Sequence, residues 1–193
     1  MARAAAAAVI LGTSAMLAAA SAAAPARTVV HYFHPFRNGK IAPEVHVTQA
    51  ARGYCWETSG VESRRYAWRC FRGNFILDPC FSSTSHTRIV LCPVEPWSSR
   101  VVRLRLTRAL PAWRLYRYAA QLPLGIWTTT GRRCVHSSGA TSEIEGKEIT
   151  YECAGGGVLA GQANAGAATW TIWYASSFKA RHLTRVGITD AWW

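Results

Sequence analysis

The sequence predicts a mainly β protein, a short-stranded sandwich or barrel-like arrangement stapled by three disulfides and with at most one short helix. Two observations lead to this prediction. Short segments that alternate apolar and polar residues recur at even spacing, separated by Gly, Pro, Asn and Asp. The chain of 193 residues also holds six cysteines, an even number that is typical of a disulfide framework.

Residues 101–107 form the clearest predicted strand. Leu104 and Leu106 fall on one face, and Arg103 and Arg105 fall on the other, because successive residues of a strand point to opposite sides. Val101 shares the arginine face by the same alternation. This strand therefore presents a basic face and an apolar face.

From residue 123 onward the pattern is β throughout. We expect two hairpins and three further strands at 124–128 with 132–136, 141–144 with 147–153, 158–161, 169–175 and 183–189. The aromatic and basic stretch 111–122 fits either one short helix or a loop.

The six cysteines are expected to pair in sequence order. We predict the disulfides Cys55–Cys70, Cys80–Cys92 and Cys134–Cys153, although six cysteines allow other pairings. The last pair lies far from the other four cysteines and flanks a hairpin pattern, which favours pairing of these two cysteines with each other. A zinc site is the competing interpretation of the four clustered cysteines, but the chain has no C-x-x-C spacing to favour it.

Residues 1–26 have the layout of a secretory signal peptide. Arg3 precedes an Ala-rich apolar stretch, and small residues follow as far as Ala26. We expect cleavage near Ala23 to Ala26 and a secreted, extracellular mature chain in a compartment that permits disulfides. An uncleaved anchor is the alternative, but the apolar run is short and Ala-rich for a spanning helix. We expect no transmembrane segment in the mature chain.

We divide the mature chain into three parts. A loosely docked N-terminal arm covers 27–50, a first cysteine-rich and basic β region covers 51–122, and a second β region covers 123–193. The two β regions are expected to pack together as one unit, because their combined length suits one domain or two small ones that share an interface.

Charge divides the chain unevenly. The formal net charge is +12, and 17 Lys and Arg against 5 Asp and Glu lie between Arg27 and Arg133. From Cys134 to Trp193 there are 4 basic and 5 acidic residues. This asymmetry favours a polyanionic partner for the first half. A basic exported protein that is kept soluble by its charge would have the same composition.

Arginines interleaved with aromatic residues form the candidate binding site. Guanidinium groups bind phosphate and carboxylate through paired hydrogen bonds, and aromatic faces stack on sugars or bases. The candidate residues are Arg100, Arg103, Arg105, Arg108, Arg114, Arg117, Trp97 and Trp113. The alternative is a solvent-facing arginine row whose methylene stems cover apolar surface.

The cysteines lie in short, distinctive motifs. These are G-x-C-W, W-R-C, G-N-x-I-x-D-P-C-F and a following cysteine in the first half, then G-x-x-C and Y-x-C in the second. With these motifs the chain resembles a group of uncharacterised exported proteins of actinobacteria. The similarity covers roughly residues 53–193. It implies a secreted, cysteine-framed domain and carries over no activity, cofactor or catalytic residue.

We therefore predict a secreted, non-enzymatic binding or cell-envelope-associated protein that captures an anionic surface polymer or acidic glycan. The chain is expected to be a monomer, with no cofactor, metal, nucleotide or catalytic residues. A secreted hydrolase of cell-wall glycan is one alternative, with carboxylates drawn from Glu143, Glu145, Glu148 and Glu152. A secreted inhibitor or effector that binds another protein is the other. Nine Trp residues could serve either the core or a binding surface.

Overall fold

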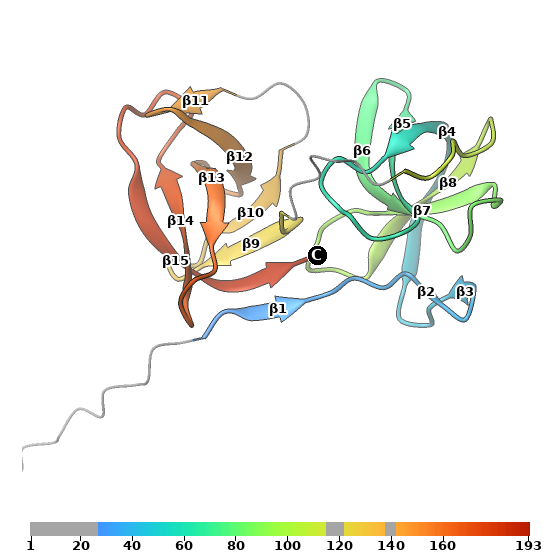
Figure 1. The fold of residues 1–193 in the computed structure, drawn as a ribbon, viewed down its shortest axis with the longest axis horizontal. Helices are drawn as coiled ribbons and strands as arrows, with labels where there is room; N and C mark the ends of the chain where they lie inside the picture. The colour runs from blue at the N-terminus through green and yellow to red at the C-terminus, as the bar shows by residue number, and fades with distance from the viewer. Residues whose placement is uncertain (1–26, 115–121, 138–141) are drawn as a thin grey trace, which may run out of the picture.

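The computed structural model describes residues 27–114, 122–137 and 142–193, and in these ranges the chain forms strands and no helix (Figure 1). The predicted mainly β fold with barrel-like sheets and three disulfides is confirmed. The predicted signal peptide, Arg117 and most of the 111–122 stretch lie outside the described residues.

The first barrel is closed by five strands. They are β4 (His46–Thr58), β5 (Ala67–Arg72), β6 (Phe75–Phe81), β7 (Ile89–Pro93) and β8 (Arg100–Leu106). Neighbours along the chain pair antiparallel, whereas β4 and β8 pair in parallel and close the barrel. Closure leaves neither strand with an unpaired edge along this seam.

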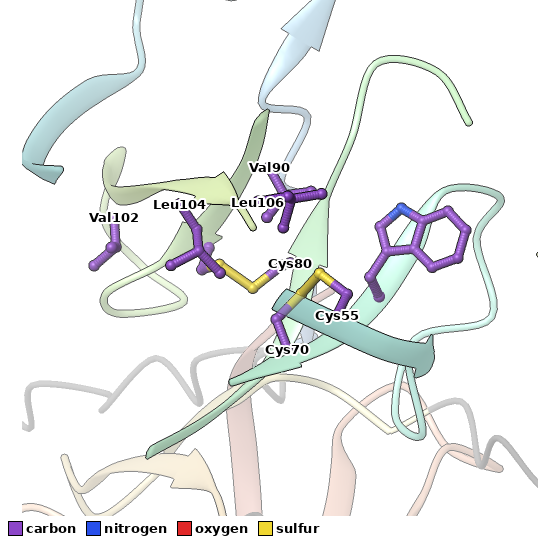
Figure 2. Packing of buried hydrophobic residues seen from close by; sticks show 9 residues of the cluster. Cys55, Cys70, Cys80, Val90, Val102, Leu104 and Leu106 are labelled. Atoms are coloured by element: carbon purple, nitrogen blue, oxygen red, sulfur yellow. A yellow bond between two sulfur atoms is a disulfide. The ribbon is translucent and has the colours of Figure 1, made fainter. Parts of the chain in front are cut away.

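Alternation along the strands fills the first barrel. Leu104 and Leu106 of β8 point inward and are buried, as predicted, together with Val90 of β7 (Figure 2). Trp68 of β5 is fully buried in the same cluster, and its Nε1 donates a hydrogen bond to the Ser82 Oγ at 2.8 Å. The indole thus lies in the core with its one polar group satisfied.

The second barrel is closed by six strands. They are β9 (Gly125–Thr128), β10 (Arg133–His136), β12 (Lys147–Cys153), β13 (Val158–Asn164), β14 (Trp170–Ala175) and β15 (Thr184–Trp192). Pairing of β15 with both β14 and β9 completes the ring, and the short β11 (Glu143–Ile144) pairs outside it with β12. Both predicted hairpins are confirmed, with Gly131 and Gly146 at positive φ in their turns.

The three disulfides join strands that already pair in the sheets. Cys55 lies opposite Cys70, and Cys134 lies opposite Cys153. Cys80–Cys92 ties β6 to β7, where few residues are in register. With sequence separations of 15, 12 and 19, each link is worth about 3 kcal/mol through the unfolded chain.

The N-terminal arm is docked onto both barrels, which corrects the expectation of a loose arm. Its first strand, β1 (Val29–His31), pairs in parallel with the end of β15. The hairpin of β2 (Phe36–Arg37) and β3 (Lys40–Ile41) then precedes Ala42 and Val45, which are buried against Leu91 and Val101 of the first barrel. Val101 is therefore covered, although alternation alone assigned it to the exposed arginine face.

An aromatic junction holds the two barrels together. Trp97, in the loop between β7 and β8, lies with its ring centroid 6.2 Å from that of Trp127 and 5.9 Å from that of Trp192. Trp127 and Trp192 of the second barrel are themselves 5.0 Å apart, and His31 of the arm stacks on Trp192. These ring contacts join the arm and both barrels at one place.

We predict that Gly125→Ala destabilises the protein by about 1–3 kcal/mol, the usual range for overpacking. A Cβ at this position would lie 2.7 Å from Pro96 Cβ and 3.2 Å from the Trp97 ring. Urea unfolding followed by Trp fluorescence would measure the change.

Gly166→Ala is the matched control, because its Cβ meets only the flexible Asn164 side chain at 3.2 Å in an exposed loop. It should change the free energy of unfolding by less than about 0.5 kcal/mol. Equal losses for the two variants would contradict a tightly packed junction at Gly125.

Candidate functional site

Three arginines meet at an open concavity on the outer wall of the first barrel. Arg103 and Arg105 project from β8, and Arg52 projects from β4. The parallel pairing sets Arg52 directly opposite Arg105 and the small Ala50 opposite Arg103. The concavity encloses about 520 Å³. We call the three guanidinium-bearing residues the arginine surface.

The local strand geometry explains why these side chains point outward. Residues on β8 alternate between the core and solvent, so Arg103 and Arg105 flank the buried Leu104. Ile89 of β7 lies opposite Arg105 and is 41% exposed, which adds an apolar patch to the concavity. The surface thus combines cationic groups with a small apolar floor.

The charges of the arginine surface are not balanced by neighbouring acids. Among the described residues, Arg52, Arg103 and Arg105 make no ion pair, whereas Arg37, Arg64 and Arg69 each have a carboxylate partner. Like charges directly opposite on adjacent strands are destabilising. An anion that binds between them would relieve this repulsion and accept hydrogen bonds from the guanidinium groups.

The other candidate residues are dispersed. Arg100 lines a neighbouring cavity, and the Arg108 guanidinium lies 3.8 Å from the centroid of the Tyr54 ring. Arg114 is exposed, and Trp113 packs against the core of the first barrel. Trp97 belongs to the aromatic junction. The structure therefore brings together Arg103 and Arg105 of the predicted set and adds Arg52.

Sequence reasoning missed Arg52 because its pairing partner lies far along the chain. The segment 46–52 is mostly exposed and has no clear alternation. Its register with β8 is set by a parallel contact between the first and last strands of the barrel. Barrel closure of this kind leaves no local signal in the sequence.

The glutamates that motivated the hydrolase alternative lie on exposed hairpin faces. Glu143 and Glu148 are opposite one another on β11 and β12, and both are exposed, as are Glu145 and Glu152. Glu145 accepts hydrogen bonds from the Leu183 backbone N–H and contacts the His182 ring. Exposure keeps these carboxylates solvated, so none resembles a general acid held in an apolar pocket.

Asp78, on β6, is an acid whose side chain is buried against the loop that follows β4. Ser59 Oγ donates a hydrogen bond to its Oδ1, the Gly60 backbone N–H donates to its Oδ2 at 3.1 Å, and Arg69 Nε lies 3.4 Å from Oδ2. Burial raises the pKa of Asp78 from 3.8 to about 6, despite these hydrogen bonds and the Arg69 charge. Because the Ser59 hydroxyl points to the carboxylate itself, this pair anchors the loop after β4.

His136 lies across the gap between the barrels from Asp78, and both residues line the same cavity of about 220 Å³. Its ring packs edge-on against Tyr151, with centroids 5.7 Å apart. Burial lowers the pKa of His136 from 6.5 to about 4, with a smaller upward effect from Glu148 and a downward one from Arg69. The imidazole is therefore neutral at pH 7.

Two histidines of the arm, His31 and His34, have different partners in the structure, and His34 Nδ1 lies 3.5 Å from Arg64 Nη1. His31 stacks on Trp192 with centroids 4.7 Å apart, and its Nε2 lies 2.9 Å from the Asp190 carboxylate. Within 27–114, 122–137 and 142–193, no group of three or more His, Cys, Asp or Glu residues is placed to hold a metal ion. His31 helps to fix the arm at the junction.

We predict that Asp78 and His136 make opposing contributions to the pH dependence of stability. The folded chain retains a proton on Asp78 that the unfolded chain releases between about pH 4 and 6, so this contribution is lost as pH rises. The unfolded chain protonates His136 below about pH 6.5, whereas the folded chain does so only near pH 4. The contribution of neutral His136 to the free energy of unfolding is therefore lost as pH falls. For each of the two residues, the change in the free energy of unfolding is on the order of 3 kcal/mol.

Urea unfolding from pH 4 to 7 would separate the two effects. Relative to the parent chain, Asp78→Asn should gain stability as pH rises, and His136→Gln should lose it. Parallel curves for the parent and both variants would rule out the two shifted pKa values.

We compared the chain with known proteins at the level of family, sequence and fold. No family model matches it, and neither a curated protein nor a solved structure does.

Proposed function

We propose that the chain is a secreted, non-enzymatic binding protein that captures an anionic cell-envelope polymer on the arginine surface. The observation that carries this proposal is the grouping of three exposed arginines, without acidic partners among the described residues, at one open concavity. The polymer would present phosphate or carboxylate groups to Arg52, Arg103 and Arg105.

The geometry suits a repeating ligand better than a small enclosed one. The concavity is open, and its cationic groups come from two adjacent strands that run in the same direction. Guanidinium forks bind phosphate and carboxylate oxygens through two parallel hydrogen bonds. Exposed Ile89 adds contact for the less polar part of a polymer repeat. Because the three arginines lie on two paired strands, the backbone fixes the positions of their Cα atoms relative to one another.

Export is supported by two features of the chain. Three disulfides are stable in oxidising compartments, and residues 1–26 have the layout of a signal peptide. None of the described residues belongs to a helix long and apolar enough to cross a bilayer. A secreted, cysteine-framed protein also fits the resemblance to exported actinobacterial proteins, and the high net charge suits an anionic cell envelope.

We predict that Arg103→Ala plus Arg105→Ala weakens binding to immobilised poly(glycerol phosphate) by about tenfold or more at low salt. Each lost phosphate contact should also reduce the slope of log K against log salt by roughly 0.7–0.9, the contribution of one released counterion on a nucleic-acid backbone. Elution with a salt gradient and titration at several salt concentrations would measure both changes.

Lys179→Ala plus Arg181→Ala is the matched control. It removes the same charge from exposed positions on the second barrel, and it should leave affinity and slope within about twofold of the parent. An equal loss for the two double variants would show that retention reports net charge alone and would overturn the proposed site.

A further inference from the structure

A second basic cavity lies on the first barrel, apart from the arginine surface. It encloses about 580 Å³ and is lined by Arg72, at the end of β5, and Arg100, at the start of β8. Arg72 donates a hydrogen bond to Gln49 Oε1, and its guanidinium lies 5.7 Å from the Phe75 ring centroid. Neither arginine makes an ion pair among the described residues.

A cleft that is lined mainly by aliphatic residues and proline, and also by Asp78 and His136, adjoins this cavity and lies between the barrels. Its walls include Pro79 and Val94 from the first barrel and Leu124 and Val135 from the second. Val94 is 42% exposed and Val135 is 37% exposed. Two aliphatic side chains from different barrels thus remain partly open to solvent on the walls of one cleft.

The basic cavity and the cleft share part of their lining. Leu77, Pro93 and Val94 line both of them. Two titratable groups line the cleft. The His136 imidazole is neutral at pH 7, whereas the Asp78 carboxylate is mostly ionised, and its buried Oδ2 lies 3.4 Å from the positively charged Arg69 Nε. We call the two adjoining cavities the groove; aliphatic side chains line one end of it and two arginines line the other.

We propose that this groove binds one free amphipathic anion, a molecule with an aliphatic chain and a terminal carboxylate or phosphate. The chain lies in the cleft between Val94 and Val135, and the anionic group accepts hydrogen bonds from Arg72 and Arg100. Charge complementarity at one end and exposed aliphatic surface at the other select this ligand class over a purely polar polyanion. The site is separate from the proposed polymer-binding surface.

Calorimetric titration of the full mature chain with decanoate, 1-decanol and acetate tests the proposal. Decanoate carries both features of the ligand, and the other two probes carry one each. We expect decanoate to bind one to one, at least tenfold more tightly than either of the other probes. Acetate binding as tight as decanoate binding would overturn the role of the cleft, and equal binding of 1-decanol would overturn the role of the arginines.

Two variants locate the ends of the ligand. Arg72→Gln plus Arg100→Gln should weaken decanoate at least tenfold and leave 1-decanol within twofold. Val135→Asp, at a partly exposed strand position, should weaken both compounds because it places a charge beside the aliphatic chain. Undiminished decanoate binding in both variants would contradict the proposed groove.

Arg103→Ala plus Arg105→Ala separates this site from the polymer-binding surface. The variant should bind decanoate like the parent chain, even if its affinity for poly(glycerol phosphate) falls. A matching loss of decanoate would place both ligands on the arginine surface and overturn the second site. Binding to phosphatidylglycerol vesicles without binding to decanoate would instead indicate a membrane surface and would also contradict a free ligand.

Discussion

The contact of Trp97 with Trp127 and Trp192 is the interaction on which the arrangement of the two barrels depends. Each barrel has its own buried cluster, so each can be understood as a small closed sheet with a disulfide framework. The cleft between them exists only while their relative position is fixed. A loop of the first barrel packs on Gly125 of the second so closely that a Cβ would collide. This fit positions Val94 and Val135 on a common cleft.

Closure of the first barrel determines where its charge is displayed. The pairing of Arg52 with Arg105 does not itself stabilise the sheet, since like charges on opposite residues of adjacent strands repel. The parallel pairing of β4 and β8 nevertheless imposes that register. The inner face of the barrel favours this register, because a Cβ on Gly53, the residue after Arg52, would collide with the Phe71 carbonyl oxygen and would lie 2.9 Å from the inward Leu104 side chain. Packing inside the barrel thus concentrates positive charge on its outer wall.

Local patterns in the sequence predicted much of the fold. Alternation located the strands at 101–107 and 147–153, and glycines at the turns located the hairpins of the second barrel. The sequential disulfides were predictable because each joins strands that are close along the chain. Contacts between segments that are distant along the chain could not be predicted in this way. The parallel pairing that brings Arg52 to Arg105 and the burial of Val101 by the arm depend on tertiary packing, which has no periodic signature. The same limit explains why Trp97 and Trp113, near the arginines in sequence, lie apart from Arg103 and Arg105.

The parallel pairing of β1 with β15 has a consequence for how the chain reaches its final form. Thr28 donates a hydrogen bond to the Ile188 carbonyl across 160 positions, and His31 is in register with Trp192. Closing so long a loop carries a large entropic cost. The second barrel can form its ring without β1, whereas the arm has no partner until β15 exists. The segment that contains β1 is therefore expected to dock late in folding, over barrels that are already formed, and to cover the edge left by the last strand.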